Sequence, residues 1–489
     1  MAHRDTAGES GAFRILTSGY GFRVIDILWN RLQQETGHTI AHMLHPSLDR
    51  SALQGRADAG NLFCLRDDVR MALPSADREH LASLEKGDEV PTVHNMIMGD
   101  EMLRQIDYDD ALAYASFMAK RMEQLYCEFR PSVVVSGFDA FHSSMSMAVA
   151  RSMGIPWFAL GFSALPTGLT GFCTGLNLGS CFSARSTPPE ALRELAEQTL
   201  RGFESQRLVA PTFVSENCLA VVLRRIPGHL KGFVKAVRRD LLQRFDRYTQ
   251  PPLRRSLRHY LRKRRNLLML PKKWFLETPL ATPYLFLGLH MQPEMAIDVW
   301  APFYSDQFNV IEAIARSTPP THKLLVKLHK IDADNYSRSQ IDRLRRLPGV
   351  EIVSPFASSR AFIEKAALVF SVQGTITLES AMLGRPVLAF GETSYFTMPS
   401  VTRVGRVTEL PAQVRDKLSE TPPAREEIIQ GLVRYLGRYA PGCYNDWEAP
   451  PSEEQIRNLG VHFAALRELL ERQAQGGDRF FVRRTRLDR

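Results

Sequence analysis

The C-terminal half of the chain alternates short apolar runs with stretches of helical spacing. Unbroken hydrophobic segments are typical of parallel strands covered on both faces, and such runs occur at 284–289, 323–328, 350–353, 367–372 and 387–390. Helices are predicted between them, at 307–317, 336–347, 359–365 and 375–383. This alternation with short loops predicts a doubly wound parallel sheet.

The segment 367–391 is the most informative of these units. Its first strand ends in a turn at Gly374, a short helix starts at Thr375, and Gly384 ends that helix before the second strand. Backbone N–H groups at such a helix start attract phosphate. Further polar groups are supplied by Ser371, Thr375, Thr377 and Glu379. The unit alone leaves two interpretations open, a nucleotide site and an ordinary capped crossover.

The N-terminal half opens with a similar unit. A strand is predicted at 13–19 and a helix at 24–35, with Ser18, Gly19 and Tyr20 between them. Open sheets build their sites at the carboxyl ends of strands, so we expect these three residues to form an acceptor-side loop. Residues 39–110 give no clear pattern, and we assign no chemical role to His45, which lies in a loop there.

A second unit of this half carries the candidate acid–base residues. An amphipathic helix at 109–129 is followed by a strand at 131–137, a helix at 145–153 and a strand at 155–160. Asp139 and His142 follow the first of these strands and could perform proton transfer. A helix cap would explain Asp139 or Ser143 equally well. The glycine-rich segment 161–180 predicts a flexible loop.

Composition narrows the class of protein. The 489 residues are 44% hydrophobic and 24% charged, as in an ordinary globular enzyme. No apolar run reaches the ~18 residues of a transmembrane helix, and the N-terminus lacks the apolar core of a signal peptide. The six cysteines form no CxxC pair or metal-like cluster. We therefore expect a cytoplasmic protein with reduced thiols.

The net charge of +9 is concentrated in residues 224–273. Arginines and lysines alternate there with Leu, Phe, Val and Tyr at helical intervals, and only Asp240 and Asp246 oppose them. A basic amphipathic helix of this kind suits the anionic inner leaflet of a membrane, which predicts a protein peripheral to the inner membrane. Nucleic acid is the competing partner, but no recognised nucleic-acid module accompanies the patch. A solvated helical face is the third interpretation.

Polar side chains lie at the ends of the first four predicted strands of the C-terminal half. They are His290, Gln292, Glu294, His329, Lys330, Ser354, Ser371 and Thr375. Because the carboxyl ends of parallel strands lie at one edge of a sheet, we expect these groups to converge there.

The predicted pattern is typical of a glycosyltransferase of the GT-B type. It has two α/β domains whose loops face each other across a cleft, and a helix N-terminus in the second domain that could bind phosphate. Over about residues 280–395 the sequence also resembles the capsule polysaccharide synthesis family, which includes bacterial Kdo-transferring enzymes. The resemblance rests on Leu289-His-Met-Gln-Pro-Glu294, Val326-Lys-Leu-His329, Ser354-Pro355 and Gly374-Thr-Ile-Thr-Leu-Glu-Ser-Ala-Met-Leu-Gly-Arg-Pro-Val387. The N-terminal half is similar only in general architecture.

The resemblance implies sugar transfer from a nucleotide sugar, CMP-Kdo or another. His329 and the Ser371/Thr375 turn, including Gly374 and Thr377, would hold the donor phosphate. Ser354 to Phe356 would border the base, Glu379 would bind a ribose hydroxyl, and Gln292 and Glu294 would face the sugar. The family commonly has His-Pro where this chain has His329-Lys330, which weakens any transfer of donor identity.

The chemistry needs a stabilised leaving phosphate and a base for the acceptor's proton. His329, Lys330 and the helix N-terminus could supply the first without a metal, and we find no convincing Asp-x-Asp pair and expect no cofactor. Asp139, His142 and Glu294 are the candidate bases, and the sequence does not rank them.

The sequence therefore predicts an α/β, GT-B-like protein of two doubly wound Rossmann-type domains facing across a cleft. Its expected function is sugar transfer to a lipid-linked or polysaccharide acceptor in bacterial capsule or surface polysaccharide synthesis. A nucleotide-sugar epimerase, a polyol-phosphate transferase and a non-catalytic partner of polysaccharide export are the alternatives. The expected divisions are a tail at 1–11, an acceptor-side domain at 12–210, a basic segment at 211–278, a nucleotide-sugar domain at 279–440, a helical segment at 441–475 and a basic tail at 476–489.

Overall fold

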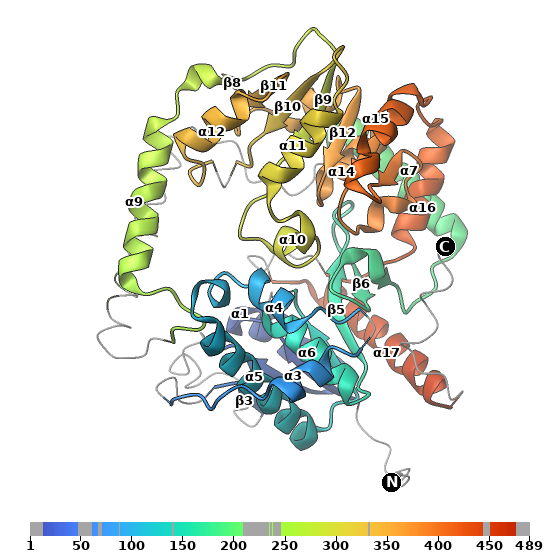
Figure 1. The fold of residues 1–489 in the computed structure, drawn as a ribbon. Coiled ribbons are helices and arrows are strands. Elements are labelled where there is room, and N and C mark those ends of the chain that lie inside the picture. The colour runs from blue at the N-terminus through green and yellow to red at the C-terminus, as the bar shows by residue number, and fades with distance from the viewer. Residues whose placement is uncertain are drawn as a thin grey trace.

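The computed structural model describes residues 13–46, 61–66, 71–87, 89–138, 141–208, 234, 237, 246–330, 333–443 and 450–475. The two predicted tails, most of 211–245 and the candidate base Asp139 lie outside the described residues. Two α/β units make up the molecule, an N-terminal unit that is blue to teal in Figure 1 and a C-terminal unit that is yellow to orange.

The N-terminal unit is built on a sheet with the order β15-β6-β5-β4-β1-β2-β3, and β7 pairs with β6. Its strands are β1 (Arg14–Ser18), β2 (Thr39–Leu44), β3 (Leu62–Cys64), β4 (Val133–Ser136), β5 (Trp157–Phe162), β6 (Leu169–Cys173), β7 (Cys181–Phe182) and β15 (Ala440–Pro441). The five strands from β3 to β5 are parallel, whereas β6, β7 and β15 pair antiparallel. The strand order reverses between β1 and β4, so the loops after these two strands flank the topological switch point.

Helices cover both faces of this sheet. They are α1 (Phe22–Val24), a π-helical turn (Ile25–Trp29), α2 (Asn30–Thr36), α3 (Arg78–Leu84), α4 (Val93–Gly99), α5 (Tyr108–Phe129), α6 (Phe141–Ser152) and α17 (Glu453–Gln475). The last helix of the described chain returns to the N-terminal unit, where Phe463 of α17 packs edge-on against Trp29 at 5.9 Å between ring centroids. The core therefore joins residues from the two ends of the sequence (Figure 1).

The C-terminal unit has a seven-stranded sheet with the order β14-β13-β12-β9-β10-β11-β8, and every pairing in it is parallel. Its strands are β8 (Phe275–Leu276), β9 (Tyr284–Gly288), β10 (Lys323–Lys327), β11 (Val350–Val353), β12 (Leu368–Ser371), β13 (Val387–Ala389) and β14 (Val401–Arg403). The order reverses between β9 and β12. The predicted doubly wound sheet is confirmed by this parallel pairing and strand order, and its central strands β9 and β12 are largely buried apolar runs as the pattern indicated.

The helices of the C-terminal unit connect these strands. They are α10 (Met295–Asp298), α11 (Gln307–Ser317), α12 (Arg338–Arg345), α13 (Ser359–Ile363), α14 (Thr375–Met382), α15 (Leu410–Ser419) and α16 (Arg425–Leu436). Helix α7 (Pro189–Glu204) follows β7 in sequence but packs against α16 of the C-terminal unit. Helix α9 (Leu253–Met269) runs along one side of the molecule between the two units (Figure 1). The fold is therefore α/β and GT-B-like, with two Rossmann-type units, as expected.

Two local expectations were wrong. The segment 161–180 is not a flexible loop, because it forms the end of β5, all of β6 and a tight return to β7. Its glycines serve close packing: a Cβ at Gly171 would lie 2.6 Å from the Cys181 Sγ atom and 2.7 Å from the Arg438 carbonyl. Helix α6 begins at Phe141 rather than at 145, which places His142 within its first turn.

Candidate functional site

The loops after β9 and β12 meet at the topological switch point of the C-terminal unit. His290 follows β9, and its Nε2 atom accepts a hydrogen bond from the backbone N–H of Gln373, 3.1 Å away. Gly374 has φ +104°, and a Cβ at this position would lie 2.8 Å from the His290 Cε1 atom. The turn therefore requires glycine, both for its backbone conformation and for the space that the imidazole fills.

This turn opens directly into α14, whose first turn carries N–H groups that lack partners within the helix. The Gly374 N–H, which was expected to be available to a ligand, instead donates to the Gln373 side-chain oxygen at 3.0 Å. Thr375 is half-buried at the start of the helix. Of the three N–H groups that were expected to be available, those of Thr375 and Ile376 thus remain at the positive end of α14.

Two of the predicted hydroxyl donors, Ser371 and Thr377, are buried. Ser371 is completely buried, and its Oγ atom donates to the Gln373 carbonyl at 2.7 Å. Thr377 is also completely buried. The Ser371 hydroxyl thus stabilises its own turn, whereas the Thr377 Oγ1 atom has no hydrogen-bond partner among the described residues. Contact of either side chain with a donor stays a prediction.

His329 and Lys330 follow β10, which is hydrogen-bonded to β9, and so share an edge with His290. The Nδ1 atom of His329 is buried and has no hydrogen-bond partner among the described residues, although the side chain as a whole is only half-buried. Burial, followed by the charge of Lys327, lowers the pKa of His329. The charge of His329 in turn helps to lower the pKa of His290 to about 4, after the larger effect of burial. Both imidazoles are therefore neutral near pH 7.

A second lysine, Lys327, lies close to His329 and Lys330, and the sequence analysis did not predict it as a site residue. Lys327 is 8% exposed at the end of β10, and its Nζ atom donates to the Pro355 carbonyl at 3.0 Å. Burial, followed by the charge of Lys330, lowers the pKa of Lys327 to about 8. A lysine inside a run of buried apolar residues was the available signal, since such a charge is retained at a cost in free energy.

The remaining predicted donor-side residues have mixed surroundings. Ser354 is buried, and its Oγ atom accepts from the Phe356 N–H at 3.3 Å, so it closes its own turn. Gln292 donates to the Ser305 carbonyl at 2.7 Å and accepts from Gln307 at 3.0 Å, so it braces the loop before α10. The position of the Gln292 amide toward a sugar stays a prediction.

Two carboxylates lie in positions that a ligand could use. Glu379 is half-buried one turn into α14, where burial raises its pKa against the opposing effects of a hydrogen bond with Thr375 and the Arg360 charge. Glu294 is half-buried at the start of α10. Helix α10 contacts the N-terminal unit, because Asp298 lies 3.9 Å from Arg104. Glu294 is thus on the C-terminal side of the contact between the units.

In the predicted acceptor-side loop, the side chains of Ser18 and Tyr20 are buried and the backbone at Gly19 is exposed. Tyr20 packs edge-on against Trp29 at 5.2 Å, while the role of this loop toward an acceptor stays a prediction. Burial raises the pKa of Tyr20. Gly19 has φ +77° and closely approaches Gly137, whose Cβ would lie 3.2 Å from the Gly19 carbonyl. These two glycines mark the switch point of the N-terminal sheet.

His142, a candidate base, is enclosed. It is 2% exposed, its Nε2 atom is 2.8 Å from the Tyr114 hydroxyl, and its ring packs edge-on against His45 at 4.2 Å. His45, to which no role was assigned, is half-buried and covers His142. Ser143 accepts a hydrogen bond from Ser136 at 3.0 Å rather than serving as a helix cap. His142 is therefore shielded from solvent by these neighbouring side chains.

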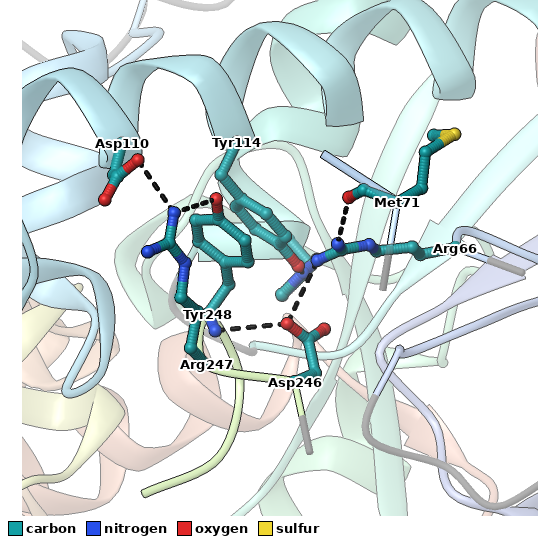
Figure 2. Close-up of polar contacts among 8 residues, drawn as sticks. Arg66, Met71, Asp110, Tyr114, Asp246, Arg247 and Tyr248 are labelled. Carbon is teal, nitrogen blue, oxygen red and sulfur yellow. Dashed lines mark hydrogen bonds and ion pairs between the residues drawn. The ribbon is translucent and has the colours of Figure 1, made fainter. Parts of the chain in front are cut away.

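A buried network joins this region to the segment that leads into α9 (Figure 2). Arg66 and Asp246, each 2% exposed, form an ion pair at 3.0 Å. Tyr248 stacks on Tyr114 at 4.8 Å, and Arg247 donates to Asp110 at 2.8 Å and to the Tyr248 hydroxyl. Residues 246–248 are thus anchored beside His142. No sequence pattern predicts this network, because Arg66 and Asp246 are about 180 residues apart in the chain.

Acid should destabilise the protein because of its buried histidines. Burial lowers the pKa of His42 and of His462 to about 3, against about 6.5 in an unfolded chain. As pH falls below 6.5 the unfolded state therefore binds more protons, so the free energy of unfolding decreases, by up to about 2 kcal/mol for each ring at about pH 5. Urea unfolding at about pH 7 and about pH 5 measures this loss. Equal stability at the two pH values would contradict the neutral, buried state of both rings.

Comparisons with known proteins give only distant likenesses. No protein-family model matches the chain, and no curated protein matches it significantly in sequence. Among solved structures, the glycosyltransferase of kitacinnamycin is 14% identical, with 94% of this chain and 99% of that chain covered and a TM-score of 0.27. A Methanocaldococcus jannaschii UDP-GlcNAc 2-epimerase in complex with UDP-GlcNAc and UDP is 13% identical, with 86% and 98% covered and a TM-score of 0.28. The β-Kdo 2,7 transferase of Thermosulfurimonas dismutans KpsC is 11% identical, with 71% and 89% covered and a TM-score of 0.32. Likeness at this level assigns no activity.

Two further findings concern the described residues alone. None of their helices is long and apolar enough to cross a membrane. Within the same residues, no group of three or more His, Cys, Asp or Glu side chains is arranged to hold a metal ion.

Proposed function

We propose that this protein is a glycosyltransferase that moves a sugar from a nucleotide-sugar donor to a lipid-linked or polysaccharide acceptor in bacterial surface polysaccharide synthesis. The observation that carries the proposal is the meeting of His290, His329, Lys330 and the start of α14 at the switch point between β9 and β12. Ligands of open α/β sheets bind at such points. The sequence resemblance over 280–395 supports the same reaction.

The donor phosphate would bind between α14 and His329. The N–H groups at the start of α14 and the Lys330 ammonium offer donors to phosphate oxygens. The Nδ1 atom of His329 supports this placement, because a buried polar atom without a partner among the described residues is costly and a ligand oxygen would satisfy it. These groups would stabilise the charge that develops on the leaving phosphate.

Glu294 is the proposed base for the acceptor's proton. Unlike His142, it is not enclosed, and it starts the helix that contacts the N-terminal unit. A base must lie within hydrogen-bond reach of the acceptor hydroxyl, and an acceptor held by the Gly19 loop would approach from that unit. Glu379 would bind the ribose, since its position one turn into α14 follows the phosphate site.

A panel of CMP-, UDP- and GDP-sugars tests the proposal. We expect one nucleotide to raise the melting temperature, because a ligand at a hundred times its Kd stabilises the folded state by about 2.7 kcal/mol. The His329→Ala variant should lose this shift in melting temperature. Its matched control is His322→Ala, at the opposite end of β10, which should retain the shift. Absence of stabilisation by all three classes would contradict nucleotide-sugar binding.

Product analysis then separates the reaction classes. With the stabilising donor and extracted glycolipid or polysaccharide, a transferase forms a new glycoside and releases the free nucleotide. An epimerase instead converts the donor sugar without any acceptor, and this outcome would replace the proposed reaction while keeping the proposed site. A donor that binds but is never consumed would favour the non-catalytic alternative.

A further inference from the structure

One face of α9 is rich in arginine and leucine and points away from the protein. The exposed residues of this helix include Arg254, Leu257, Arg258, Leu261, Arg262 and Arg265. Successive members of this set are alternately three residues and one residue apart, which places them along one side of a helix with 3.6 residues per turn. Leu257 and Leu261 are 43% and 57% exposed in the middle of the row, and we call this surface the Arg–Leu face.

The opposite side of α9 fixes the helix to both units. Arg255 pairs with Glu101 of the N-terminal unit at 3.9 Å. Lys263 pairs with Asp334 of the C-terminal unit at 3.5 Å, and the buried Asn266 donates to the Asp334 carbonyl at 3.2 Å. The orientation of the helix is therefore set, and its outer side is committed to solvent or to a partner.

The arginines of the Arg–Leu face make no ion pair with any residue that the structure describes. Among the described residues, no carboxylate pairs with its arginines, and Arg262 contacts only the neighbouring His259 ring, at 3.0 Å. On the inner side of the same helix, by contrast, Arg255 and Lys263 both have acidic partners. Within the described part of the chain, the outer side of α9 thus carries a row of arginines without carboxylate partners around two exposed leucines.

We propose that the Arg–Leu face docks on an anionic lipid bilayer. The arginines match the negative charge of acidic headgroups, and the two leucines are placed to enter the boundary between headgroups and acyl chains. Nucleic acid would use the arginines but leave the leucines exposed to water, because binding to phosphates is electrostatic. The leucines at the centre of the row therefore favour the bilayer over a polyanion.

Docking would also orient the candidate site. Before the N-terminal end of α9, Tyr248 stacks on Tyr114 (Figure 2). Tyr114 in turn contacts His142. At the other end, Asn266 contacts the Asn335 carbonyl, and the Asn335 amide donates to the Gln292 carbonyl at 3.2 Å. Both halves of the candidate site are thus fixed to one helix. If the proposed function holds, a docked α9 would present them to a lipid-linked acceptor.

Vesicle sedimentation with the full chain tests the docking. Vesicles of phosphatidylcholine with about a third phosphatidylglycerol should bind the protein, whereas pure phosphatidylcholine should bind it at least about tenfold more weakly. Arg258→Glu with Arg262→Glu should reduce binding to the anionic vesicles by about a hundredfold, and Leu257→Ser with Leu261→Ser by about tenfold. Thermal unfolding of each variant verifies that the fold is intact.

Matched controls separate the Arg–Leu face from general surface effects. Arg346→Glu with Arg406→Glu changes the same charge at exposed positions elsewhere, and Val407→Ser with Val461→Ser removes exposed apolar groups elsewhere. These controls should bind within about twofold of the unmodified protein. Vesicle binding that is unaffected by the α9 changes overturns the proposal. Binding that falls with the arginines but not with the leucines, together with tighter binding to duplex DNA, overturns it in favour of a polyanion site.

Discussion

Replacing His329 with alanine is expected to lower donor turnover by about a hundredfold or more, because one preorganised group that stabilises developing charge is typically worth that much. The fold should remain intact, since the Nδ1 atom of His329 has no partner to lose among the described residues. Steady-state rates with the stabilising nucleotide sugar measure the effect, and circular dichroism verifies the fold.

His322→Ala is the control for this change. His322 directly precedes β10, whereas His329 follows it, so the two histidines lie at opposite edges of one sheet. The control should keep its turnover within about twofold. Unchanged turnover in His329→Ala would remove the central assignment, and equal losses in both variants would indicate a general effect on β10 rather than a role in the site.

Gly374→Ala is expected to reduce donor affinity by at least about tenfold, through the position of His290. The added Cβ would lie 2.8 Å from the His290 Cε1 atom, so the ring must move from the hydrogen bond that it accepts from Gln373. The residue also has φ +104°, which an L side chain adopts only with strain. Calorimetric titration with the donor measures the affinity.

Gly384→Ala isolates the steric part of this effect. Gly384 ends the same helix with φ +66°, but a Cβ there would meet nothing closer than the Ile428 Cδ1 atom at 3.7 Å. Both variants should lose some thermal stability, because each forces alanine into the left-handed region. Only Gly374→Ala should lose donor affinity. A donor affinity preserved in Gly374→Ala would mean that the His290 contact does not matter for binding.

The sequence predicted the C-terminal sheet well because its signal was local. Strands such as β12 are unbroken apolar runs, and α11 begins after Asp306, whose side chain accepts hydrogen bonds from the Phe308 and Asn309 N–H groups. The gathering of polar groups at one edge follows from parallel pairing alone. The meeting of His290 with the Gln373 turn could be anticipated once β9 was placed beside β12.

The use of each polar group could not be predicted in the same way. Ser371 and Thr375 look alike in sequence, yet the first is buried in its own turn and the second is half-buried at the helix start. Gln292 braces a loop because Ser305 and Gln307 return beside it. The glycines of 161–180 predicted a flexible loop, whereas the structure uses them for close packing. The sequence does not separate the two cases, because both favour glycine. Partners distant in sequence decided each of these cases.

The central claim is that the polar ends of β9, β10 and β12 surround a single anionic leaving group. A crystal structure with the nucleotide selected by the donor panel tests it most directly. The account predicts phosphate oxygens at about 3 Å from the His329 Nδ1 atom and from the backbone N–H of Thr375. A nucleotide bound elsewhere, with its phosphates away from His329 and from the start of α14, would contradict it.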